Sequence, residues 1–161
     1  MPDSLYNRDF YAWTKEQADA LRREALHGNN APIDWENIAE ELESLGRSDW
    51  NELESRLAVL LVHLLKLIYV EEQRDRNARQ WRLSINEQRR MIPKRLKQSP
   101  SLSQVLRTSF PGIYGEALEV AAEEVEVDLS RFPAEPPFTL DQALDRAYPE
   151  HLVPPHRRPQ G

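Results

Sequence analysis

Cysteine is absent from this chain of 161 residues. Its absence excludes disulfides, thiolate zinc sites and cysteine nucleophiles together. Glycine is scarce as well, with five in all, and a glycine loop that wraps a phosphate is hard to build from so few. The sequence has no nucleophile elbow and no HExxH zinc motif. The common catalytic templates are therefore missing, and we expect no cofactor.

Long apolar segments and export signals are lacking too. The most apolar run of the sequence, residues 57–70, is too short to span a bilayer and contains His63 and Lys66. The N-terminal stretch MPDSLYNRDFYAW shows neither the basic region nor the apolar core of a signal peptide. We therefore expect a cytoplasmic protein without a membrane partner.

Composition and length favour a folded globular protein. Hydrophobic residues make up 40% of the chain and charged residues 30%, a balance typical of folded domains. The length suits one domain with its own core. Seven of the twelve prolines lie after residue 132. We expect a single helical domain over residues 1–148 and a proline-rich, frayed tail without function over residues 149–161.

The charge, −6 overall, is segregated along the chain. Residues 34–54 hold eight acids and one base, residues 74–97 nine bases and two acids, and residues 116–145 nine acids and one base. Blocks of opposite sign either steer a charged partner or attract each other within the fold. In one small domain, we expect mutual attraction between helices.

The apolar run predicts a helix that is buried on nearly every side. At 100° per residue, apolar residues form a continuous stripe along one face of the helix, and further apolar residues lie on the opposite face. A helix that is apolar on opposite faces is buried by neighbours on several sides. It predicts an all-α bundle of about five main helices around a central helix over about 48–71. The stripe consists of Leu53, Leu57, Leu60, Leu64 and Leu67, and the opposite face has Val62, Leu65 and Tyr69.

A second helix precedes the central one, over about 34–45. Asp34 is a good N-cap residue. Gly46 is predicted to end this helix, and Ser48 is predicted to be the N-cap of the central helix. One continuous helix through Gly46 is the alternative, and we favour the break.

Prolines divide the segment that follows. A helix over about 77–97 should kink or end near Ile92, because Pro93 removes a hydrogen bond from its interior. Ser99-Pro100 reads as the cap and first position of the next helix. Pro111-Gly112 should split that helix into two pieces.

Two further helices lie near the chain ends. The first covers about residues 8–26, with Asn7 or Asp9 as its cap. Near the C-terminus, Thr139-x-x-Gln142 has the pattern of a capping box. It predicts a short helix over about residues 139–147, packed on the bundle.

Several strings of the sequence occur together in one known family. They are DFYAW at 9–13, DWENIAEELESLGRS at 34–48, LESRLAVLLVHLLKLIY at 53–69, WRLSINEQRR at 81–90, SPSL at 99–102 and PFTLDQAL at 137–144. This set resembles the bacterial domain-of-unknown-function family number twenty-nine over about residues 6–148. The resemblance implies an all-α fold and a bacterial source, with no assigned activity. Family members often have Cys-Pro where this chain has Pro136-Pro137, so no general mechanism here depends on that cysteine.

His63 is the first candidate for chemistry, because it interrupts the apolar run and an unperturbed histidine titrates near neutral pH. One interpretation is a structural histidine bonded to Gln88, Ser84 or a carboxylate of the helix over 34–45. The alternative is a site for proton transfer or ligand binding. Gln88 shares a face with apolar residues, so geometry makes it the expected partner of His63.

The alternative site would draw on several helices. Its catalytic candidates are His63, Glu41 and Lys66, and its ligand-binding candidates include Arg56 and Gln88, with the cations holding an anion. A metal site built on His63 and Glu41 is weaker still, because one histidine and one carboxylate supply too few ligands.

The basic helix over 77–97 gives the remaining candidates. Arg82 and Arg89, next to Trp81, are of the type that binds phosphates or stacks on bases. Trp81 itself fits the apolar stripe and is expected in the core. The bases therefore either meet acidic helices, face an acidic protein partner or bind nucleic acid.

From the sequence, our leading hypothesis is a cytoplasmic protein-interaction or regulatory module without catalysis of its own. Self-association and an antitoxin-like role both fit that hypothesis. The alternatives are an enzyme or small-ligand binder centred on His63, and nucleic-acid binding through the basic helix.

Overall fold

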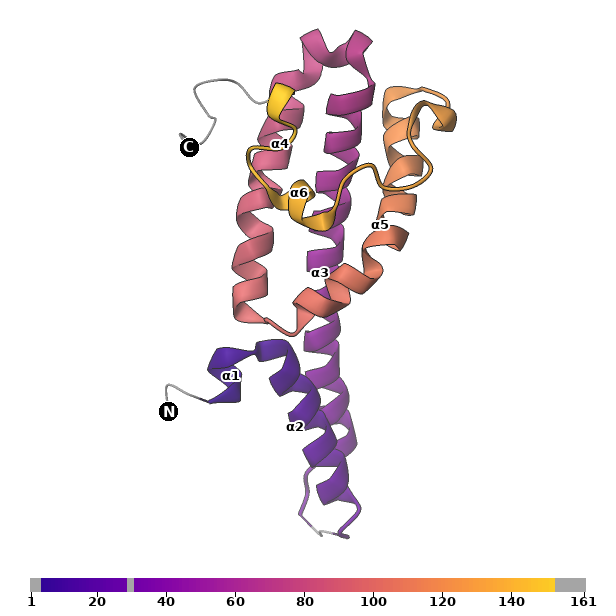
Figure 1. Cartoon of the computed structure of the whole chain (residues 1–161). Helices are drawn as coiled ribbons and strands as arrows, with labels where there is room; N and C mark the ends of the chain where they lie inside the picture. The colour runs from indigo at the N-terminus through magenta and orange to yellow at the C-terminus, as the bar shows by residue number, and fades with distance from the viewer. Residues whose placement is uncertain (1–3, 29–30, 153–161) are drawn as a thin grey trace. The chain divides into compact units, whose positions relative to one another are not determined.

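The computed structural model describes residues 4–28 and 31–152, and every regular element in these ranges is helical (Figure 1). The all-α prediction is confirmed. No helix in the described part of the chain is long and apolar enough to cross a membrane. The elements are α1 (Leu5–Arg8), α2 (Phe10–Ala25), α3 (Trp35–Tyr69), α4 (Glu71–Gln98), α5 (Leu102–Val125), the 3-10 turn η1 (Leu129–Arg131), α6 (Leu140–Leu144) and the 3-10 turn η2 (Glu150–Leu152).

The chain forms two compact units. Unit 1 consists of Met1–Leu53 and Lys94–Val105, and unit 2 of Glu54–Pro93 and Leu106–Gly161. Residues 149–152, which we assigned to the tail, are ordered in part by packing: Pro149 is buried and η2 follows it. Residues 153–161 of that tail lie outside the described residues.

Gly46 does not end a helix, and α3 runs unbroken through it, so the predicted break is wrong. The described helices thus include four long ones, α2 to α5, where we expected about five main helices. Glycine is needed at position 46 for space. A Cβ atom there would lie 2.6 Å from the Oγ1 atom of Thr14 on α2, so Gly46 allows α2 and α3 to approach closely.

The predicted helix end at Pro93 and the predicted split at Pro111 are also wrong, while a kink at Pro93 stays a prediction. Pro93 lies inside α4 and Pro111 inside α5, and both helices continue beyond them. A proline removes one backbone hydrogen bond. The residues beside the two prolines, Ile92 and Phe110, are buried, so tertiary packing compensates for that loss.

α4 begins at Glu71, earlier than the predicted start at residue 77. Arg74 explains the tight connection with α3. Its Nε atom donates to the carbonyl of Leu67 at 2.8 Å, and its Nη2 atom donates to the carbonyl of Ile68 at 3.1 Å. These bonds satisfy carbonyls that the end of α3 leaves open.

In unit 1, Asp9 joins the starts of α2 and α5. Its Oδ1 atom accepts from the Ala12 amide at 2.9 Å, which makes Asp9 the N-cap of α2. Its Oδ2 atom accepts from the Ser101 amide at 2.7 Å. The hydroxyl of Ser99, which we expected to cap α5, instead accepts from the Tyr11 amide at 3.1 Å.

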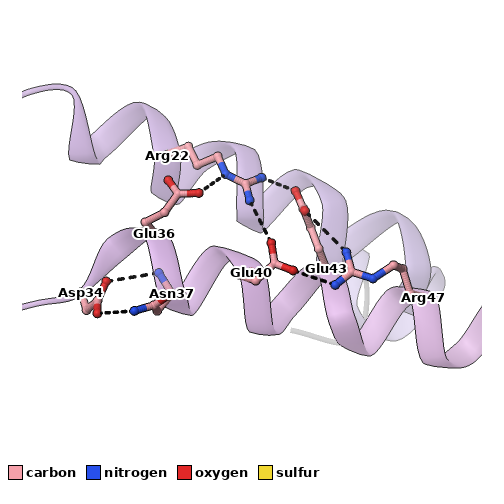
Figure 2. Close-up of polar contacts among 7 residues, drawn as sticks. All are labelled: Arg22, Asp34, Glu36, Asn37, Glu40, Glu43 and Arg47. Carbon is pink, nitrogen blue, oxygen red and sulfur yellow. Dashed lines mark hydrogen bonds and ion pairs between the residues drawn. The ribbon is translucent and has the colours of Figure 1, made fainter.

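Arg22 of α2 holds the first turns of α3 in unit 1 through three carboxylates (Figure 2). Its Nε atom lies 3.0 Å from Glu36, its Nη2 atom lies 3.8 Å from Glu40, and its Nη1 atom pairs with Glu43. The Glu43 hydrogen bond is the largest cause that raises the pKa of Arg22. Arg22 thus contacts three of the five acids between residues 34 and 43, and its single positive charge offsets part of their negative charge.

Unit 2 contains the predicted buried helix, the second half of α3. Most of its leucine and valine side chains are almost fully buried, as are further apolar residues of the unit. The α3 residues are Leu57, Leu60, Leu61, Val62, Leu64, Leu65 and Leu67, and the others include Val70, Trp81, Ile85, Leu106, Ile113, Tyr114, Phe138 and Ala143. Trp81 is a core residue, as expected. The capping box at the start of α6 is present, with Thr139 and Gln142 bonded reciprocally.

Candidate functional site

The main concave site of unit 2 is a pocket of about 370 Å³. Four arginines line it together with an apolar wall, and no acid stands among its described lining residues. The polar members are Arg82, Asn86, Arg89, Arg90, Arg146 and Tyr148, and the apolar members are Leu64, Leu67, Ile85, Pro149 and Leu152. We call this the arginine pocket.

Arg89 builds the pocket more than it offers charge to it. Its side chain is 4% exposed. Its Nε atom donates to the carbonyl of Ala143 at 2.8 Å, and its Nη2 atom donates to the carbonyl of Tyr148 at 2.7 Å. These bonds fix α6 and the segment that follows it against α4. Burial lowers the pKa of Arg89 to about 10, while the nearby Asp145 carboxylate acts in the opposite direction.

Arg82 has an unsatisfied donor at the pocket. Its Nε atom is buried and has no hydrogen-bond partner among the described residues. A buried donor without a partner costs about 1–3 kcal/mol. A ligand oxygen that accepts from this N–H would recover that energy.

Tyr148 adds a neutral donor to the pocket wall. Burial raises the pKa of its hydroxyl above the usual 10.0, while Arg89 acts in the opposite direction. The hydroxyl therefore keeps its proton at neutral pH. The pocket therefore contains cationic groups and neutral hydrogen-bond donors. These groups suit the binding of an anion rather than general acid–base catalysis.

His63 lies apart from the arginine pocket, in a shallow hollow of about 160 Å³. Its Nδ1 atom lies 2.7 Å from the carbonyl of Val59, four residues earlier on α3. Because a carbonyl only accepts, Nδ1 carries the proton. The hollow is otherwise mostly apolar, with Glu116 and Glu124 among its lining residues.

The predicted partners of His63 are engaged elsewhere. Gln88 accepts from the Nη1 atom of Arg56 at 3.1 Å, so the expected bond between Gln88 and His63 is not seen. Lys66 is 5% exposed and pairs with Glu124. The hypothetical site centred on His63 is thus divided among separate local contacts.

Glu41 does not reach His63 either. The two residues lie on the same helix, about six turns apart at 3.6 residues per turn. In the part of the chain with described coordinates, no group of three or more His, Cys, Asp or Glu side chains is placed to hold a metal ion.

Charge blocks of opposite sign interact in the described part of the chain, as the contact of Arg95 with Glu52 and the electrostatic effect of Asp145 on Arg89 show. Arg95 lies 2.9 Å from Glu52 and joins the basic block to the acidic block over 34–54. By contrast, Arg82, Arg89 and Arg90 of the basic block gather at the arginine pocket.

Sequence reasoning identified Arg82 and Arg89 but missed the other half of the site. Arg146, Tyr148, Pro149 and Leu152 come from a segment that we assigned to the end of the domain and the tail. The only signal for these residues in the sequence was a basic residue, Arg146, two positions before Tyr148. That this segment lies beside α4 depends on the hydrogen bonds of Arg89, and no local sequence pattern encodes those bonds.

The fold and the site define an all-helical protein with a basic pocket. The chain belongs to the family described as Domain of unknown function DUF29, whose model matches residues 5–149. It is also similar to an alpha-helical protein of unknown function from Rhodospirillum rubrum ATCC 11170, whose crystal structure was determined at 1.45 Å resolution. The two share 22% identity over 93% of this chain and 96% of that chain, with a TM-score of 0.74. That likeness supports the fold alone. No curated protein matches the chain.

Proposed function

We propose that this protein is a non-catalytic binding module whose ligand is a small organic anion held in the arginine pocket. The observation that carries the proposal is the buried, unsatisfied Nε atom of Arg82 in a pocket lined by three other arginines. The pocket's volume falls in the range of small-molecule sites.

The ligand should combine an anionic head with an apolar body. The arginines and the Tyr148 hydroxyl supply donors for phosphate or carboxylate oxygens. Apolar side chains from α3, α4 and η2 supply a surface for a hydrocarbon or aromatic part. The ligand thus differs from a bare inorganic anion, which would leave the apolar wall uncovered.

A second candidate function is interaction with another protein. It is favoured by Ile38 and Leu45 of unit 1, which are 43% and 51% exposed and lie seven residues apart on α3. Residues at that spacing share a helix face. The regulatory, self-associating and antitoxin-like roles, and the cytoplasmic location, stay predictions.

The test is isothermal titration of the full chain at low salt with phenyl phosphate and with inorganic phosphate. We expect phenyl phosphate to bind more tightly. Arg82→Gln should weaken its binding about tenfold or more, the scale of one charge-assisted contact. Arg146→Gln, which alters an exposed residue of the pocket wall, should weaken binding as well.

Arg79→Gln is the matched control, since Arg79 is an exposed α4 residue outside the pocket lining. It should leave binding within about twofold of the unmodified protein. Equal weakening by Arg79→Gln and Arg82→Gln would show general charge attraction and overturn the proposal. Binding of an acidic peptide or duplex DNA without binding of phenyl phosphate would overturn it in favour of a macromolecular partner.

A further inference from the structure

Unit 1 has a separate hollow that the proposed function does not use. Its volume is about 340 Å³, and it combines two aromatic rings, one carboxylate, one guanidinium and two side-chain amides. The lining residues are Tyr6, Asn7, Phe10, Asp49, Arg95 and Gln98.

The aromatic rim of this hollow is held in place by ring packing. Tyr6 is 53% exposed, yet its ring contacts Phe10 edge to face at 5.7 Å between centroids and Trp13 at 4.9 Å. Phe10 stacks on Trp13 at 5.7 Å. A ring that is exposed but fixed by two neighbours is preorganised to contact a ligand, because little side-chain entropy is left to lose.

Asp49 places a half-buried carboxylate beside these rings. The residue is half-buried, and burial raises the pKa of its carboxyl group above the usual value, while Arg95 acts in the opposite direction. Among the described residues, none donates a hydrogen bond or forms an ion pair to the Asp49 carboxylate. A carboxylate partly withdrawn from water in this way is stabilised by a cation.

Arg95 is the nearby cation, but its donors are directed to other groups. Its Nη2 atom lies 2.9 Å from Glu52, and its Nη1 atom donates to Gln98 at 3.4 Å. The charge of Arg95 is thus compensated by Glu52. This leaves the Asp49 carboxylate and the ring quadrupoles as the attractive features of the hollow.

We infer that this hollow binds an organic ammonium group, placed between the Asp49 carboxylate and the rings of Tyr6 and Phe10. A cation over an aromatic face is attracted to the ring quadrupole, and the attraction grows with desolvation. A primary ammonium has three donors. The carboxylate and the side-chain carbonyl of Gln98 accept from it at this site. An anionic ligand is disfavoured there, because Asp49 and Glu52 repel it.

The experiment is an NMR titration of the full chain with n-butylammonium chloride, matched at each step against the same concentration of sodium chloride. We expect saturable shifts of the Trp13 indole N–H and the Tyr6 amide with the amine only. Asp49→Asn should weaken binding about tenfold. Tyr6→Leu, which changes an exposed ring, should weaken it several-fold.

Asp19→Asn is the control, since Asp19 is an exposed α2 residue outside the hollow. It should leave the affinity unchanged. Equal affinities in Asp49→Asn and Asp19→Asn, or shifts that sodium chloride reproduces, would overturn the inference.

A second titration distinguishes the sources of the ammonium group. It uses the tripeptide Ac-Gly-Lys-Gly-amide in place of n-butylammonium. Equal affinity for the two probes supports recognition of the head group in a free amine. Tighter binding of the tripeptide supports a lysine side chain of a partner protein. Absence of binding by both probes would contradict the site.

Discussion

At the scale of single residues, Gly46 shows how a glycine inside a helix is explained by its neighbour. The Oγ1 atom of Thr14 lies 2.6 Å from the place that a Cβ atom on residue 46 would take. Thr14 is fully buried, and its hydroxyl donates to the Tyr11 carbonyl at 2.7 Å. Thr14 therefore cannot move aside without losing that hydrogen bond.

Gly46→Ala should consequently destabilise the protein by about 1–2 kcal/mol, because overpacking outweighs the gain in helix propensity. Gly115→Ala is the matched control, since a Cβ atom there meets nothing within 4 Å. It should stabilise the protein by about 0.5–1 kcal/mol. Urea unfolding at neutral pH measures both, and stabilisation by Gly46→Ala would refute the packing argument.

His63 makes a prediction about pH. Burial lowers the pKa of His63 below its usual 6.5, and Lys66 adds to that effect, while the Val59 carbonyl and Glu124 oppose it. Glu116 also lines the hollow. Because the folded pKa is the lower one, the unfolded chain takes up the proton first as the pH falls. Protonation therefore costs stability as the pH drops below about 6.5.

His63→Gln should reduce the loss of unfolding free energy between pH 7 and pH 5, without affecting phenyl phosphate binding. His27→Gln, which replaces an exposed histidine, is the comparison variant. Denaturant unfolding at several pH values measures the difference. An unchanged slope in His63→Gln would contradict the role assigned to burial.

At the scale of helices, the strings DFYAW and SPSL have a shared structural reason. Asp9 accepts hydrogen bonds from the Ala12 and Ser101 amides and from the Ser101 hydroxyl, the last at 2.9 Å. Ser99 in turn accepts from the Tyr11 amide. Two helix starts, distant in sequence, thus complete each other in unit 1. Asp9, Ser99 and Ser101 of these strings therefore have an architectural role.

Asp9→Ala should destabilise the protein by about 2 kcal/mol or more, because it removes an N-cap and leaves the amide at the start of α5 without its acceptor. The comparison is Asp19→Ala on the exposed face of α2, expected within about 0.5 kcal/mol of the unmodified protein. Thermal unfolding followed by circular dichroism measures both. Equal destabilisation by Asp9→Ala and Asp19→Ala would contradict the view that the Asp9 hydrogen bonds connect the starts of α2 and α5.

Predictions from the sequence succeeded where a local pattern determines the structure. The buried half of α3, Trp81 in the core and the Thr139 capping box follow from periodicity and capping chemistry. The predicted helix ends at Gly46 and Pro93 and the predicted split at Pro111 were wrong because tertiary packing outweighed a local propensity.

At the scale of the whole molecule, the candidate site could be only half predicted. The basic character of α4 marked Arg82 and Arg89 as ligand-binding candidates before any fold was known. The other half depends on where the segment after α6 lies, which two long-range hydrogen bonds from Arg89 determine. The expected bond between His63 and Gln88 is not seen for a similar reason, because Gln88 accepts from Arg56 instead.

The central claim, that the arginine pocket takes an organic anion, is tested most directly at the Arg82 Nε–H group. Its NMR signal can be followed while phenyl phosphate is added to the full chain. The account predicts a saturable downfield shift of the Arg82 Hε proton, as expected when an unpartnered donor gains an anionic acceptor. An Arg82 signal that stays unmoved at saturating phenyl phosphate would contradict it.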